Sequence, residues 1–150
     1  MEFEAAVYRL RLRLGLVDLS EIVEWADYQI SHSNLVSESI LAIATLAKSE
    51  RNKALSLLNE LSSSVSDLAV LPKVLGDSAK QIRERPGLSP NLAKEMYQIS
   101  VENKYEIPND LSLIEWFDDA YSLAISAEHG TTNEVHQRLV GFANRFASTR

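Results

Sequence analysis

The stretch DLSEIVEWADYQI, residues 18–30, is typical of an amphipathic helix. Asp18 and Glu21 have the spacing of a capping box, in which side-chain oxygens accept hydrogen bonds from the first backbone N–H groups of a helix. The residues that follow at helical spacing on one face are Leu19, Ile22, Val23, Ala26 and Ile30. The stretch therefore predicts a helix over 19–31, with Trp25 on the flank of its apolar stripe.

Similar spacing continues on both sides of this stretch. Helices are expected over 2–14, 19–31, 35–47, 50–62, 67–85, 90–103 and 111–128, and again after Thr131. In the first of them the stripe is Phe3, Val7, Leu10 and Leu14, although the Arg-Leu alternation over 9–14 also fits a strand. Short connections, such as the one before residue 50, favour antiparallel helical hairpins.

Residues with known helix-end preferences mark most of these boundaries. Gly15 is placed to end the first helix, because glycine readily adopts the left-handed conformation found there. Ser49, Ser89 and Asp110 are expected N-caps, and Thr131 with Glu134 repeats the capping-box spacing.

The middle of the chain is less regular. Residues 62–66, SSSVS, have the composition of a linker and are a possible soft junction. Pro72 and Gly76 interrupt the next apolar pattern, so residues 67–85 are expected to form a short helical turn and then a helix that ends before Pro86.

Composition supports an all-α fold. Leu and Ala together supply 36 of the 150 residues, whereas Thr supplies four, and there are only five Gly and four Pro. Leu and Ala lose little conformational freedom in a helix. We therefore expect one domain over 1–150, a bundle of about seven to eight helices arranged as antiparallel hairpins.

The same composition argues against several classes of protein. The chain has no cysteine, and its longest apolar run, ILAIATLA at 40–47, is far shorter than the roughly 20 residues that span a bilayer. Its acidic start does not look like a secretory signal, so a cytoplasmic protein without membrane association is expected. The net charge of −6 disfavours nucleic acid as a partner, and the basic runs at 9–13 and 80–85 are short.

Nothing in the sequence has the pattern of an active site or a cofactor site. His32 and His129 fall near helix ends, where an imidazolium suits the helix dipole, and His129 and His136 lack the spacing of a helical zinc pair. Asp118 and Asp119 point about 100° apart on a helix, which does not suit a shared metal ion. A non-enzymatic protein without cofactor or metal is therefore expected, and an enzyme ranks below the binding functions.

The segment LIEWFDDAYSLAI, residues 113–125, repeats the Glu-Trp-x-Asp pattern of residues 24–27. One interpretation is that each tryptophan covers the edge of a core while the neighbouring acids are merely solvated. The other is a docking surface, in which aromatic anchors supply contact area and acids steer a basic partner. The residues of this candidate surface are Glu21, Glu24, Trp25, Asp27, Tyr28, Glu115, Trp116, Asp118 and Asp119.

Residues 9–30, with RLGL at 13–16 and WAD at 25–27, resemble the opening of uncharacterised bacterial helical proteins. The whole chain is similar in kind to bacterial toxin-immunity proteins, which are small, acidic, helical and free of cysteine; several block nucleases through acidic, aromatic helices. No motif carries this second likeness, and no site residue is taken from it. It implies an inhibitor of a basic toxin domain; the alternative is a helical-repeat-like scaffold or adaptor that binds a peptide or protein.

Overall fold

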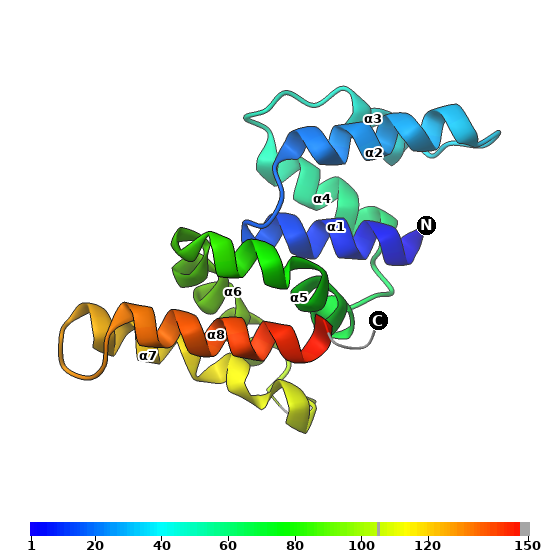
Figure 1. Ribbon diagram of the computed structural model, residues 1–150. Helices are drawn as coiled ribbons and strands as arrows, with labels where there is room; N and C mark the ends of the chain where they lie inside the picture. The colour runs from blue at the N-terminus through cyan, green and yellow to red at the C-terminus, as the bar shows by residue number, and fades with distance from the viewer. Residues whose placement is uncertain (105, 148–150) are drawn as a thin grey trace. The chain divides into compact units, whose positions relative to one another are not determined.

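The computed structural model describes residues 1–104 and 106–147, and its regular elements in this part of the chain are all helical (Figure 1). The predicted all-α class is thereby confirmed, with eight α-helices and two short 3₁₀ helices in the described residues. The chain divides into two compact units, residues 1–66 and 67–150, at the end of the serine-rich 62–66 segment.

The first unit contains four helices: α1 (Glu2–Leu14), α2 (Leu19–His32), α3 (Glu38–Ala44) and α4 (Arg51–Leu61). Helix α1 packs against α4, while α3 packs against both α2 and α4 (Figure 1). Residues 2–14 are helical, so the strand interpretation of the Arg-Leu alternation is excluded. Gly15 ends α1 in the left-handed conformation with φ 79°, as its position predicted.

The buried side chain of Arg9 connects α1 to the last residues of this unit by hydrogen bonds. Arg9 is only 8% exposed, and its guanidinium donates hydrogen bonds to the Ser62 carbonyl at 3.0 Å, the Ser62 hydroxyl at 2.7 Å and the Val65 carbonyl at 2.6 Å. Arg11 lies 3.5 Å from the Glu21 carboxylate. The basic run at 9–13 therefore serves contacts inside the unit rather than presenting a continuous basic face.

Three expectations for the first unit were wrong in detail. Helix α3 is shorter than the predicted 35–47, and Glu50 rather than Ser49 stands at the N-cap of α4. The Glu50 side chain accepts a hydrogen bond from the Ala47 N–H at 2.9 Å. Phe3 is 49% exposed although it follows the apolar spacing.

The second unit contains α5 (Asp67–Glu84), η1 (Pro86–Leu88), α6 (Ser89–Glu102), η2 (Asn109–Glu115), α7 (Phe117–Ile125) and α8 (Thr132–Ala147). Helices α5 and α8 lie side by side and form the most extensive packing in this unit, while α6 packs against η2 and α7 (Figure 1). The Thr131–Glu134 capping pair forms as predicted, with the Glu134 N–H donating to the Thr131 hydroxyl at 3.2 Å.

Helix α5 runs without a break through Pro72 and Gly76, which corrects the expected interruption. A β-carbon added at Gly76 would lie 2.5 Å from the carbonyl oxygen of Phe146 in α8. No real side chain fits there, so Gly76 is where the backbones of two helices meet and not where a helix stops. Burial of Leu71, Val74 and Leu75 outweighs the backbone hydrogen bond that Pro72 cannot make.

The expected helix over 111–128 is also wrong in part. Residues 109–115 form the 3₁₀ helix η2, and α7 begins only at Phe117, so Trp116 lies at the joint between the two. Asp110 does not cap this segment, since Pro108 stands at the N-cap of η2 without a side-chain cap bond. Ser89 does not cap α6 either; Leu88 stands at that N-cap, and Ser89 is turned inward.

Candidate functional site

The outer face of α2 carries the first group of candidate residues. Asp18 caps this helix by accepting a hydrogen bond from the Glu21 N–H at 3.2 Å. Hydrogen bonds from the Ser20 hydroxyl and the Glu21 N–H hold the pKa of the Asp18 carboxyl below its ordinary value. Glu21, Glu24 and Asp27 are exposed on the helix that this cap begins.

Tyr28 adds an aromatic group to the same helix and is 57% exposed. Its ring stacks on His32 with centroids 4.0 Å apart, and the His32 Nδ1 atom lies 2.9 Å from the Tyr28 carbonyl oxygen. This end of α2 therefore presents a tyrosine and an imidazole on a surface that is otherwise acidic.

Trp25 belongs to the core and not to this surface. It is 7% exposed, its indole N–H donates to the Glu4 carboxylate at 3.0 Å, and its ring lies 5.2 Å from that of Tyr8. A tryptophan that covers a core and satisfies its one donor leaves little surface for a partner. For Trp25 the geometry matches the packing interpretation.

Trp116 has a different environment. It is 39% exposed at the joint between η2 and α7, whereas the adjacent Phe117 is 1% exposed. The Arg138 guanidinium lies over the Trp116 ring, 5.3 Å from its centroid, in cation–π geometry. Arg138 therefore restrains the Trp116 ring, which is still partly open to solvent.

Acidic residues accompany Trp116 as predicted by the pattern, but they differ in exposure. Glu115 and Asp119 are exposed, while Asp118 is half-buried. Asp119 lies beside a hollow that also reaches Glu134 and His129. The acids are therefore spread around the tryptophan and do not form one cluster.

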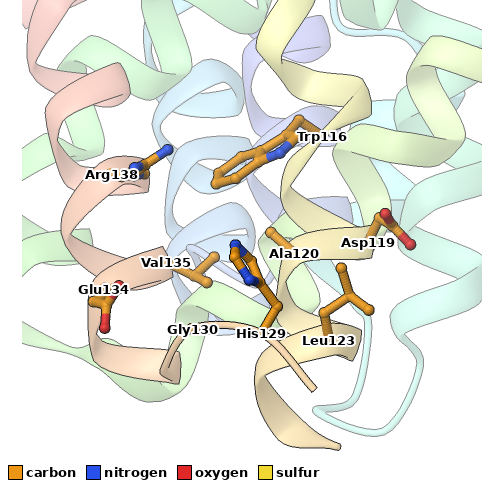
Figure 2. A pocket seen from close by; sticks show the side chains of 9 residues that line it. All are labelled: Trp116, Asp119, Ala120, Leu123, His129, Gly130, Glu134, Val135 and Arg138. Carbon is orange, nitrogen blue, oxygen red and sulfur yellow. The ribbon is translucent and has the colours of Figure 1, made fainter. Parts of the chain in front are cut away.

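Trp116 and Arg138 separate two hollows of different chemistry. The first, the polar pocket, has a volume of about 130 Å³ and is shown in Figure 2, where the His129 ring points toward the Trp116 indole. Its lining residues are Trp116, Asp119, Ala120, Leu123, His129, Gly130, Glu134, Val135 and Arg138. Its wall carries two carboxylates and one guanidinium, so negative groups outnumber positive ones there.

The second hollow, the arginine groove, has a volume of about 370 Å³. It is lined by Leu113, Trp116, Phe117, Arg138, Phe142 and Arg145. The Phe142 ring lies 5.5 Å from that of Phe117, and the Arg145 guanidinium lies 5.6 Å from the Phe142 centroid. The wall is therefore aromatic and aliphatic, and its charged groups are both cationic.

The two groups of candidate residues belong to different units. Residues 21–28 lie in the first unit and residues 115–119 in the second. A single surface made from both groups stays a prediction.

A buried polar cluster in the second unit was missed by sequence reasoning. The Ser89 hydroxyl and the Nδ1 atom of His136 are 2.7 Å apart, and the His136 Nε2 atom lies 3.4 Å from the Arg83 carbonyl oxygen. The nearby Tyr121 hydroxyl is buried and makes no hydrogen bond to any described residue. Burial raises the pKa of Tyr121.

This cluster resembles a nucleophile with its base, but its position argues for a structural role. Ser89 has no exposed surface, His136 is 4% exposed, and neither lines the polar pocket or the arginine groove. In this conformation the Ser89 hydroxyl is therefore closed off from a substrate in solution. No local sequence pattern could have shown this cluster, because Ser89 and His136 lie on different helices and are 47 residues apart in the chain.

The described residues lack two features that would indicate other functions. No group of three or more His, Asp or Glu side chains is arranged to hold a metal ion in residues 1–104 and 106–147. Among these residues there is also no helix with the length and apolar character needed to cross a bilayer.

Comparisons with known proteins give no assignment: no family model matches the chain, and neither a curated protein nor a solved structure shows significant similarity to it. The likeness to toxin-immunity proteins and the resemblance over residues 9–30 therefore stay predictions.

Proposed function

We propose that this chain is a non-enzymatic protein-binding protein whose docking surface centres on Trp116. The observation that carries the proposal is the position of this side chain, which is 39% exposed, stacked with Arg138 and bordered by a hollow on each side. Tryptophan and arginine are enriched among the residues that dominate binding energy at protein interfaces. Trp116 is the one tryptophan of the chain with substantial exposure, since Trp25 is 7% exposed.

The charge near this anchor favours a basic partner. Glu115 and Asp119 are exposed, Asp119 and Glu134 line the polar pocket, and each unit carries three more acidic than basic residues. Acids around an aromatic anchor accelerate the approach of a cationic protein. In its most concrete form the proposal is an immunity or inhibitor protein that neutralises a basic bacterial toxin domain in the cytoplasm.

The partner would be isolated by co-purification from the native host, and the test then compares two charge reversals. Glu115→Lys with Asp119→Lys should weaken the complex more than tenfold, about 1.4 kcal/mol, mainly by slowing association. Glu24→Lys with Asp27→Lys makes the same change in net charge on α2 and should have the smaller effect. Surface plasmon resonance at two salt concentrations measures both.

Either of two results would contradict the proposal. A complex unaffected by Glu115→Lys with Asp119→Lys and by Trp116→Ala would exclude the Trp116 surface. A complex weakened only by Glu24→Lys with Asp27→Lys would place the docking surface on α2. Circular dichroism of each variant checks that its helices are retained.

A second candidate function is a scaffold or adaptor that holds a peptide without inhibiting anything. The observation that favours it is the arginine groove, which has a largely apolar wall and a volume of about 370 Å³. The two functions differ in one assay: an inhibitor abolishes the activity of its partner at equimolar ratio, whereas an adaptor leaves that activity intact.

A further inference from the structure

The polar pocket beside Trp116 has a wall whose chemistry indicates what it can hold. Its volume of about 130 Å³ is close to that of a protein cavity of about 150 Å³ that binds benzene, so it admits one side chain and not a peptide backbone. We propose that this pocket receives a lysine side chain of the partner. The proposal rests on the protein-binding function and goes beyond it by naming the group that the partner inserts.

Carboxylates are in excess among the charged groups that line the pocket. Asp119 on α7 and Glu134 on α8 carry two negative charges, against one positive charge on Arg138. In Figure 2 the two acids lie on opposite sides of the hollow, with the His129 ring between them. A cation that enters between the acids approaches both carboxylates, and a neutral imidazole nitrogen can accept a further hydrogen bond from it.

Both carboxylates have oxygen atoms available for a ligand. No ion pair or side-chain hydrogen bond joins Asp119 to another residue in 1–104 or 106–147. The Glu134 Oε1 atom accepts a hydrogen bond from the Thr131 hydroxyl at 3.2 Å. The Glu134 Oε2 atom lies on the side of Gly130, 3.9 Å from where a β-carbon on that glycine would be, and Gly130 itself lines the pocket. The bond to Thr131 therefore orients Glu134 and leaves its second oxygen toward the pocket.

The apolar part of the wall suits the methylene chain of lysine. Ala120, Leu123 and Val135 contribute aliphatic side chains, and the Trp116 indole forms another part of the wall (Figure 2). Lysine packs its apolar stem along such a surface while its ammonium stays with polar groups. A bare metal ion would leave this apolar surface uncovered, so the composition of the wall favours a side chain.

Arg138 favours lysine over arginine as the occupant. Its guanidinium already lies over the Trp116 ring, 5.3 Å from the centroid. An incoming arginine would compete for the same aromatic ring, whereas an ammonium is a compact charge whose three N–H donors need only oxygen or nitrogen acceptors. Arg138 also repels a cation in the pocket, so its removal should strengthen the binding of lysine and weaken the binding of an anion.

The loop between α7 and α8 holds its side of the pocket in place. The backbone N–H groups of Glu128 and His129 both donate to the Leu123 carbonyl, at 3.0 and 3.3 Å. At the other end of the loop the Glu134 N–H donates to the Thr131 hydroxyl at 3.2 Å. A wall that is ordered before binding loses less conformational entropy when a ligand enters.

The test follows the indole N–H signal of Trp116 in a ¹⁵N–¹H spectrum of the full chain at constant low salt. The chain has two tryptophans, so two such signals are expected, and Trp116→Phe identifies the one beside the pocket. The Trp25 signal, from the other unit, is the internal reference. The probes are acetylated and amidated tripeptides with glycine at both ends and lysine, norleucine, arginine or glutamate in the middle. Norleucine keeps an apolar stem without the ammonium.

The peptides should differ in the order that the wall predicts. The lysine peptide should shift the Trp116 signal saturably, with a dissociation constant below about 10 mM, and the norleucine peptide should bind about fivefold more weakly. The arginine peptide should bind about threefold more weakly than the lysine peptide, because Arg138 occupies the indole. The glutamate peptide should produce no saturable shift.

Substitutions in the wall test each charge separately. Asp119→Asn and Glu134→Gln should each weaken the lysine peptide by about threefold, and glutamine keeps an oxygen for the Thr131 hydroxyl. Glu128→Gln makes the same change in charge at an exposed position of the same loop that does not line the pocket, and it should have no effect. Arg138→Gln should strengthen the lysine peptide by about twofold. Unchanged amide dispersion shows that each variant is folded.

Several outcomes would overturn the inference. No saturable shift with the lysine peptide, or equal affinity for the lysine and norleucine peptides, would refute an ammonium site. An arginine peptide that binds more tightly than lysine would refute the choice of lysine. Saturable binding of the glutamate peptide that is lost in Arg138→Gln would assign the pocket to an anion. Butylamine binding as tightly as the lysine peptide would assign it to a free amine.

Failure here and failure of the proposed function are separable. A partner complex that is weakened by Trp116→Ala but unaffected by Glu134→Gln would keep the function and refute the lysine pocket. Binding of the lysine peptide at the pocket, with a partner complex insensitive to Trp116→Ala, would keep the pocket and refute the proposed surface.

Discussion

Trp25 and Trp116 occupy the same position in two similar stretches of sequence, yet one is 7% and the other 39% exposed. Trp25 lies inside a continuous helix, donates to Glu4 and fills the core of the first unit. Trp116 lies at a joint between η2 and α7 and holds Arg138 against its face. A shared Glu-Trp-x-Asp pattern therefore does not specify a shared role.

The residue after each tryptophan explains much of this difference. Ala26 follows Trp25, and although it is fully buried it fills little space, so the indole can enter the core beside it. Phe117 follows Trp116 and takes the buried position itself, with its ring 5.5 Å from Phe142. Two large aromatic side chains at adjacent positions cannot both point inward, because neighbours on a helix differ by about 100° in direction.

The largest effect is expected from removing the residue that displaces Trp116. Phe117→Ala should destabilise the second unit by roughly 3–5 kcal/mol, because it loses a buried ring and leaves a cavity. Denaturant unfolding followed by circular dichroism measures this change. Glu24→Ala, on the exposed face of α2, is the control and should change stability by no more than about 0.5 kcal/mol. The reverse order would mean that both helix rotations are wrong.

The two tryptophans can be compared directly by the same truncation. Trp25→Ala should cost about 3–5 kcal/mol of stability, and Trp116→Ala roughly half as much because part of its ring is already solvated. Binding should show the opposite order, with loss of the complex in Trp116→Ala only. Equal effects of the two substitutions on stability and on binding would contradict the assignment of Trp25 to the core and of Trp116 to the binding surface.

The buried hydroxyl of Tyr121 allows the hydrogen bonding in the core of the second unit to be tested. Tyr121→Phe removes a buried hydroxyl that has no hydrogen-bond partner among the described residues, so stability at pH 7 should change by less than about 1 kcal/mol. Because burial raises the pKa of Tyr121 above 10.0, the wild-type protein should lose stability as the pH rises past about 10. Melting curves between about pH 9 and 11 should show a smaller loss for Tyr121→Phe. Identical alkaline profiles would indicate that the phenol is solvated.

The smallest effect concerns the start of the Trp25 helix. Asparagine caps a helix as well as aspartate does, so Asp18→Asn should melt like the wild type near pH 7. The pKa of Asp18 is lowered below 3.8 in the folded chain, so its contribution is present above that pH and is lost as the pH falls through the folded pKa. The variant should therefore lose less stability than the wild type on acidification to about pH 3. Asp110→Asn is the matched control, because Asp110 makes no cap bond at the start of η2.

Local chemistry predicted the parts of the fold in which neighbours along the chain determine conformation. The Asp18 cap, the Gly15 stop and the Thr131–Glu134 pair all depend on residues within one helical turn. Ser89 has the same local signal for a cap, but its hydroxyl instead contacts His136, 47 residues away. A cap prediction fails where a buried partner from a distant helix competes for the same side chain.

The sequence indicated which residue types lie around Trp116, but not how the structure arranges them. Within the pattern at residues 115–119 the structure exposes Trp116, and a role of these residues in binding a partner stays a prediction. Arg138 and Arg145 were not anticipated, because their role depends on α8 packing beside α7 and not on any motif. The break before Phe117 has the same origin, since apolar spacing alone does not distinguish a 3₁₀ turn from an α-helical one over seven residues.

The close approach of Gly76 to Phe146 also has a consequence for the nascent chain. Helix α5 finds its main partner only when α8 has been made, 63 residues after α5 ends, which at about 5–20 residues per second takes about 3–13 seconds. For helix α6, the end of its partner α7 is synthesised only 23 residues after α6 ends. During synthesis the apolar face of α5 is thus uncovered longest in the second unit, and it is the surface there that a chaperone would have most time to bind.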